Sequence, residues 1–122
     1  MKLLLVEDNP ALRQIIKQLV SPLAHEIYEC ADGAEAVAAW HTHHPDCVLM
    51  DIALGAMDGL TATRAITTAD ATAMVIIVTS YDEVEMGETA QRAGASGYVQ
   101  KDNLLELPTI LQTCFQLKEK KS

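Results

Sequence analysis

The sequence predicts a single α/β domain built on a doubly wound parallel sheet. Short apolar runs alternate five times with longer amphipathic stretches, which is the pattern of repeated βα units. Three runs are hydrophobic at nearly every position, as expected for strands covered by helices on both faces: Leu3–Val6, Val48–Met50 and Val75–Val78. The length fits one domain with one core, which we expect to span residues 1–122.

The strands of this sheet are expected to be short and to lie at regular intervals along the chain. The apolar and β-branched runs place them at Lys2–Val6, Glu26–Ala31, Asp46–Asp51, Met74–Thr79 and Ser96–Gln100. The second alternates polar and apolar residues, so we expect it at an edge of the sheet.

Helices are expected between and after these strands, at Pro10–Leu23, Gly33–His43, Leu60–Ala69, Glu83–Ala93 and from Pro108 to about Lys118. Asp8 or Asn9 can cap the first helix, and Asp82 can cap the fourth. Pro108 would clash inside a helix that began at Asn103, so residues 103–107 are expected to form a separate turn.

The composition excludes several classes of function. A formal charge of −8 repels polyanions, so we do not expect this domain to bind nucleic acid directly. No apolar run approaches the roughly 20 residues needed to span a membrane. We therefore expect the domain not to bind a membrane. The odd number of cysteines, three, and the lack of a CxxC pair fit a reducing compartment, so the expected localisation is cytoplasmic.

Polar side chains follow four of the predicted strands. Glu7 and Asp8 follow the first strand, Asp51 ends the third, Thr79 ends the fourth and Lys101 follows the fifth. Since sites in open α/β sheets form at the carboxyl ends of strands, we expect these side chains to meet. Three neighbouring carboxylates would repel one another, and a hard divalent cation such as Mg²⁺ would relieve the repulsion.

This set of residues favours phosphoryl chemistry. An ionised aspartate is a known nucleophile towards phosphorus, and a metal ion and a lysine neutralise the phosphoryl oxygens. Asp51 lies at the end of an apolar strand, where an unpaired charge would be costly to bury. We therefore expect Asp51 to become an aspartyl phosphate.

The motifs "LLLVEDNP", "VLMDIALGAMDG", "VIIVTS" and "GASGYVQK" together resemble the CheY-like receiver domain of two-component response regulators. The likeness covers essentially the whole chain. It implies a flavodoxin-like fold with strand order 2-1-3-4-5 and a phosphorylation-activated signalling switch. Such a protein is not an enzyme acting on other substrates, because it catalyses only its own Mg²⁺-dependent phosphorylation and dephosphorylation.

The resemblance also implies a role for each site residue. Asp51 would be the phosphoacceptor and, with Asp8, a direct Mg²⁺ ligand. Glu7 would act through water, and the backbone carbonyl of Ala53 would be the third protein ligand. The hydroxyl of Thr79 would move to the phosphoryl group, and Lys101 would pair with a phosphoryl oxygen. The aromatic ring of Tyr98 would turn inward when Thr79 moves.

The implied partners are a sensor histidine kinase or a phosphotransfer protein as donor, and a downstream protein or an attached output domain as target. The fourth helix, fifth strand and last helix are the output surface of the family, and a homodimer is compatible with it. The "KD" at Lys101–Asp102 resembles receivers of the NarL/FixJ type, which carry a DNA-binding domain. The chain is expected to be either a stand-alone receiver or one excised from such a regulator.

Other classes of function fit less well. A haloacid-dehalogenase-type phosphatase would need a second aspartate at Ala53. A flavodoxin-type flavin carrier would need a phosphate loop where Glu7 and Asp8 would repel phosphate. A pseudo-receiver that acts only as a protein-binding module remains the alternative.

Overall fold

Strands and helices alternate along the whole chain in the computed structural model, which describes residues 1–55 and 57–121, with side chains as far as residue 119. The strands are β1 (Lys2–Val6), β2 (Glu26–Cys30), β3 (Cys47–Met50), β4 (Val75–Thr79) and β5 (Gly97–Gln100). The helices are α1 (Pro10–Val20), α2 (Gly33–His43), α3 (Gly59–Ala69), α4 (Glu83–Arg92), the 3₁₀ helix η1 (Lys101–Glu106) and α5 (Leu107–Lys121).

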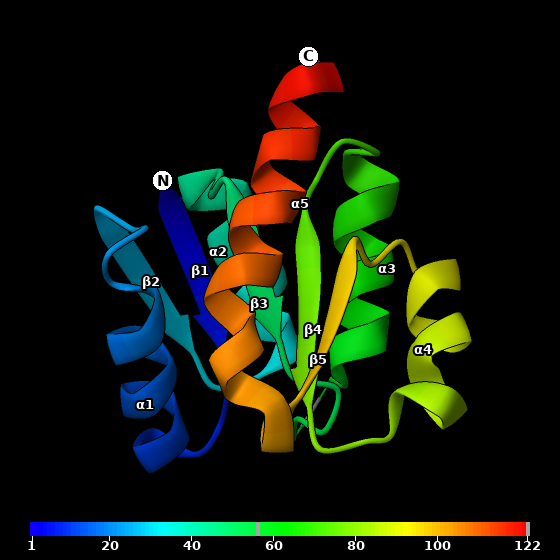
Figure 1. Ribbon diagram of the computed structural model, residues 1–122. Coiled ribbons are helices and arrows are strands. Elements are labelled where there is room, and N and C mark those ends of the chain that lie inside the picture. The colour runs from blue at the N-terminus through cyan, green and yellow to red at the C-terminus, as the bar shows by residue number, and fades with distance from the viewer. Residues whose placement is uncertain (56, 122) are drawn as a thin grey trace.

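The strands pair in parallel in the order β2-β1-β3-β4-β5, so the predicted fold class and strand order are confirmed. In Figure 1, α1 and α5 lie in front of the sheet, and α2, α3 and α4 cover the opposite side. The chain reverses its winding direction between β1 and β3. Their carboxyl ends therefore lie side by side, with crossovers on opposite faces, which is where open α/β sheets place their sites.

Two hydrophobic clusters sandwich the sheet. Alternate residues of each central strand point to opposite faces, so that Leu4 and Ile77 pack under α2, α3 and α4, whereas Leu3 and Ile76 pack under α1 and α5. Every residue of β3 and β4 is buried. This two-sided burial explains why these strands are continuous apolar runs rather than alternating ones.

The predicted helix limits were close, with one clear error. The first helix ends at Val20, not Leu23, because Pro22 has no N–H to donate to a helical carbonyl. Asn9, rather than Asp8, caps it by accepting a hydrogen bond from Leu12 N. The expected break before the last helix is confirmed within one residue, since η1 ends at Glu106 and α5 begins at Leu107.

Two further expectations concern the cysteines and membranes. Cys30, Cys47 and Cys114 are all free thiols. Within the described residues, every helix is too short or too polar to cross a membrane.

Gly59 sets the connection between β3 and α3. Its N–H donates to Ile52 O at 2.9 Å, and a Cβ on Gly59 would lie 1.8 Å from the carbonyl oxygen of Asp51. No side chain fits there without moving the backbone that carries Asp51. The close approach therefore holds the end of β3 in place.

We expect Gly59→Ala to lower the free energy of unfolding by at least about 3 kcal/mol, because the backbone at Asp51 must shift to admit the methyl group. Gly55→Ala is the matched control, since a Cβ there meets nothing within 4 Å. It should change the stability by less than about 1 kcal/mol. Urea unfolding followed by circular dichroism measures both, and equal effects would contradict the steric account.

Candidate functional site

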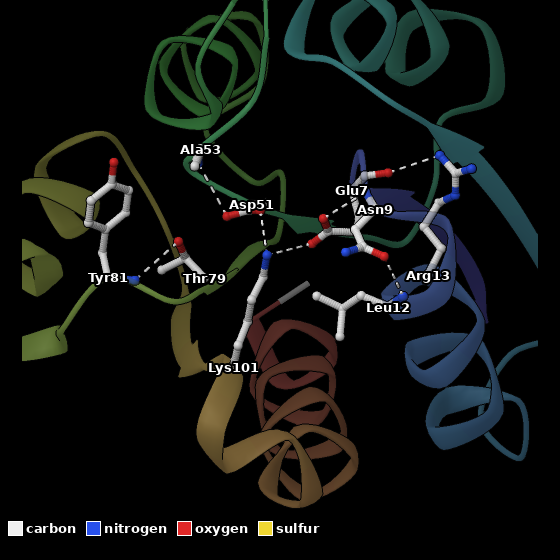
Figure 2. A network of polar contacts seen from close by, with 9 residues as sticks. All are labelled: Glu7, Asn9, Leu12, Arg13, Asp51, Ala53, Thr79, Tyr81 and Lys101. Atoms are coloured by element: carbon white, nitrogen blue, oxygen red, sulfur yellow. Dashed lines mark hydrogen bonds and ion pairs between the residues drawn. The ribbon is translucent and has the colours of Figure 1, made fainter.

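The carboxyl ends of β1, β3 and β4 and the start of η1 bring the predicted site residues together. Figure 2 shows Glu7, Asp51 and Lys101 pointing toward one another, with Thr79 beside them. The pairing of β1 with β3 places the strand ends in register, and Asp51 N donates to Val6 O at 3.1 Å. Parallel pairing thus converts residues 44 positions apart in the sequence, Glu7 and Asp51, into neighbours.

Lys101 bridges the two buried carboxylates. Its Nζ lies 2.7 Å from Asp51 Oδ2 and 2.9 Å from Glu7 Oε1. The side chains of Glu7 and Asp51 are only 1% and 2% exposed, whereas that of Lys101 is 21% exposed. Two carboxylates removed from water need a counter-charge, and the ammonium group provides it.

Hydrogen bonds from nearby groups fix the carboxylates further. Asn9 N donates to Glu7 Oε2 at 3.1 Å, and Arg13 donates to the backbone oxygen of Glu7 at 3.0 Å. Ala53 N donates to Asp51 Oδ1 at 3.2 Å. The role of Arg13 was not predicted from the sequence, because nothing in the helical pattern of α1 distinguishes it from the other polar residues of that helix.

The site still has an excess of negative charge. Ligand oxygens of Glu7, Asp8 and Asp51 lie within 4.8 Å of one another. Glu7 Oε1 is buried and has no hydrogen bond of good geometry, although Lys101 Nζ lies nearby. Carboxylate oxygens grouped in this way are the donors that Mg²⁺ prefers, so the residues fit such an ion. The contribution of the Ala53 carbonyl stays a prediction.

The titration of this cluster reflects its crowding. Burial raises the pKa of Glu7 above its ordinary value, and the charge of Asp51 acts in the same direction, against the pairing with Lys101 and the hydrogen bond from Asn9 N. Burial alone would lower the pKa of Lys101, but its pairing with Asp51 and Glu7 outweighs this and raises it. The ammonium group therefore stays charged at neutral pH.

Thr79 and Tyr98 are connected through the backbone of Tyr81. Thr79 is fully buried, and its Oγ1 accepts a long hydrogen bond of 3.5 Å from Tyr81 N. Tyr98 donates its hydroxyl to Tyr81 O at 2.7 Å, and burial raises its pKa to about 12. The sequence pointed to Thr79 and Tyr98 but not to the connection between them, because that connection runs through main-chain atoms of Tyr81 that any residue supplies.

We expect Lys101→Met to lower the free energy of unfolding by about 3 kcal/mol in metal-free buffer, since it leaves two buried carboxylates without a counter-charge. Adding Asp51→Asn should recover part of that loss by removing one of these charges. Lys17→Met is the control, because the Lys17–Glu29 pair is partly exposed and should contribute at most about 1 kcal/mol. Equal losses for both lysines, measured by urea unfolding, would contradict this account.

Comparisons with known proteins agree with the fold. The response regulator receiver domain is the family whose model matches, over residues 3–112. The chemotaxis protein CheY of Halobacterium salinarum is 35% identical over 100 residues, which cover 82% of this chain and 83% of that protein. The regulatory protein AtoC of Escherichia coli is 34% identical over 98% of this chain, but the match spans only 26% of AtoC.

A solved structure extends the similarity to three dimensions. The CheX–CheY–BeF₃–Mg²⁺ complex from Borrelia burgdorferi contains a chain that superposes with a TM-score of 0.88 at 25% identity, covering 94% of this chain and 89% of that one. The five-stranded parallel sheet, the acidic cluster at its carboxyl edge and the family match over nearly the full length lead to one conclusion. The chain belongs to the receiver-domain family of two-component response regulators, whose general function is phosphorylation-dependent signalling.

Proposed function

We propose that this chain is a single receiver domain over residues 1–122 that accepts a phosphoryl group on Asp51. The observation that carries the proposal is the Lys101 bridge between Glu7 and Asp51 beside Asp8. It places a counter-charge against the buried carboxylate of Asp51, the group that would act as nucleophile. It also leaves a cation ready to pair with incoming phosphoryl oxygens.

In the proposed transfer, a carboxylate oxygen of Asp51 attacks phosphorus. The bond from phosphorus to the donor histidine nitrogen breaks, and its electron pair stays on that nitrogen. Lys101 exchanges part of its contact with Asp51 for a phosphoryl oxygen, so the negative charge that arrives is matched by an ammonium group already in place.

The acidic cluster would hold Mg²⁺ for this step. Asp8 and Asp51 would be direct ligands together with the Ala53 carbonyl, and Glu7 would act through water. When bound, the ion would supply a positive charge that stabilises the phosphoryl oxygens. The donor set supports the choice of a hard cation, and a similar CheY is described in a complex with BeF₃ and Mg²⁺.

Thr79, Tyr81 and Tyr98 would carry the signal away from Asp51. The hydroxyl of Thr79 would move to a phosphoryl oxygen and give up its long hydrogen bond with Tyr81 N. Tyr98 donates a hydrogen bond to the carbonyl oxygen of Tyr81. A shift of the Tyr81 backbone would therefore free Tyr98 to turn inward. Phosphorylation would thus shift a two-state equilibrium at the α4–β5 edge.

Receiver domains in response regulators interact with kinases and output domains. For this chain we propose a cytoplasmic location, with a sensor histidine kinase or a phosphotransfer protein as donor. The target would be a downstream protein or an attached output domain, with α4, β5 and α5 as the contact surface. A homodimer formed through the same surface fits this arrangement.

The test is the mass of the intact protein after incubation with acetyl phosphate and Mg²⁺. The wild type should gain one phosphoryl group, because Asp51 is paired with Lys101 beside the acidic cluster that would hold Mg²⁺. Asp51→Asn should gain none, and omission of Mg²⁺ should abolish the gain in the wild type. If the folded wild type gains no phosphoryl group, the chain is better explained as a pseudo-receiver that only binds other proteins.

A further inference from the structure

A hollow of about 850 Å³ opens at the edge of the acidic cluster, beside Asp8 and Ala53. It lies between the segment that follows β3, helix α3 and the start of α4. Asp8 and Ala53 line it at the end facing the phosphorylation site, Tyr81 and Met86 line it on the α4 side, and Arg64 reaches it from α3. The hollow therefore borders two neighbours of the Asp51 carboxylate, since Asp8 belongs to the same acidic cluster and Ala53 N donates to Asp51 Oδ1.

Arg64 is the unusual residue in this hollow. Among the lysine and arginine side chains that the structure describes, it alone makes neither a hydrogen bond nor an ion pair. The lining also holds two carboxylates, Asp8 and Asp58, neither of which forms an ion pair with Arg64; Asp58 instead accepts hydrogen bonds from Thr61 N and Oγ1 at 2.8 and 3.0 Å. In a chain of net charge −8, an exposed arginine without an acidic partner is available for an anion from solution.

The contacts of Asp51 decide from which side a donor approaches. Lys101 and Glu7 fill one side of its carboxylate, and Ala53 bonds to the other oxygen. Figure 2 shows Ala53 and Tyr81 on the side away from Glu7. In phosphoryl transfer the leaving group departs in line, opposite the nucleophile. A leaving group on a phosphorus atom in front of Asp51 would thus enter the hollow.

We propose that this hollow is a leaving-group subsite for small acyl phosphates, with Arg64 pairing with the carboxylate that departs. The subsite rests on the proposed role of Asp51 as phosphoacceptor. Asp51 attacks phosphorus, the bond between phosphorus and the acyl oxygen breaks, and the electron pair leaves with the carboxylate, so no proton is required. The apolar lining from Leu54, Leu60 and Met86 suits the alkyl part of a short acyl group.

The role of Arg64 can be separated from general attraction of anions. Acetyl phosphate releases a carboxylate, whereas phosphoramidate releases neutral ammonia after its nitrogen has taken up a proton. Both donors deliver the same phosphoryl group to Asp51 and Lys101. An arginine that binds the leaving group should therefore accelerate phosphorylation by the first donor and have little effect on the second.

The experiment measures phosphorylation rates of the full chain with each donor at saturating Mg²⁺, followed by intact mass. Arg64→Gln should slow the reaction with acetyl phosphate about fivefold, as expected for loss of one solvent-accessible charge pair, and leave the rate with phosphoramidate unchanged. Arg64→Lys should retain most of the wild-type rate. Arg92→Gln removes an equal charge at a site paired with Glu88 on α4, and should affect neither donor.

Three outcomes would overturn the subsite. Equal slowing with both donors would assign Arg64 to general electrostatics, and unchanged rates would remove it from the reaction. Failure of the folded wild type to gain a phosphoryl group from either donor would overturn the subsite together with the proposed function. When phosphoramidate phosphorylates the wild type normally, either of the first two outcomes would overturn the subsite alone.

Discussion

The ion pairs from Lys101 to Glu7 and Asp51 are the interaction on which the rest of the site depends. Both carboxylates are almost fully buried, and neither would stay charged there without an opposing charge. The sheet provides the positions, since β1 and β3 pair directly and η1 begins where β5 ends. The fold therefore concentrates negative charge at one edge, and Lys101 offsets part of that charge.

The same arrangement links the site to the surface. Thr79 ends β4 beside Asp51, and Tyr81 then joins Thr79 to Tyr98 on β5 through its main-chain N–H and C=O. The hydrogen bond at Thr79 is long, whereas the one at Tyr98 is short, so the weaker contact is the one adjacent to the site. A change at Asp51 would thus first affect the contact that is easiest to break.

Much of this could be predicted from the sequence, because the residues that matter follow apolar strands. A parallel sheet places the residues after each strand at one edge, so Glu7, Asp51 and Lys101 could be grouped before any coordinates were known. The predicted end of α1 was wrong because the apolar Leu23 continues the helical pattern past Pro22. The Tyr81 link and the unpaired Arg64 could not be predicted, since they depend on main-chain geometry and on side-chain packing between distant elements.

The central claim is that a phosphoryl group at Asp51 engages Lys101. The resulting conformational change then reaches Tyr98 through the backbone of Tyr81. The most direct measurement is a backbone amide NMR spectrum recorded before and after addition of Mg²⁺ and beryllofluoride, the combination described for the similar CheY complex. The account predicts shift changes at Asp51, Thr79 and Lys101 that continue to Tyr98 and are absent in Asp51→Asn. Changes that stop at Asp51, or that persist in the variant, would contradict it.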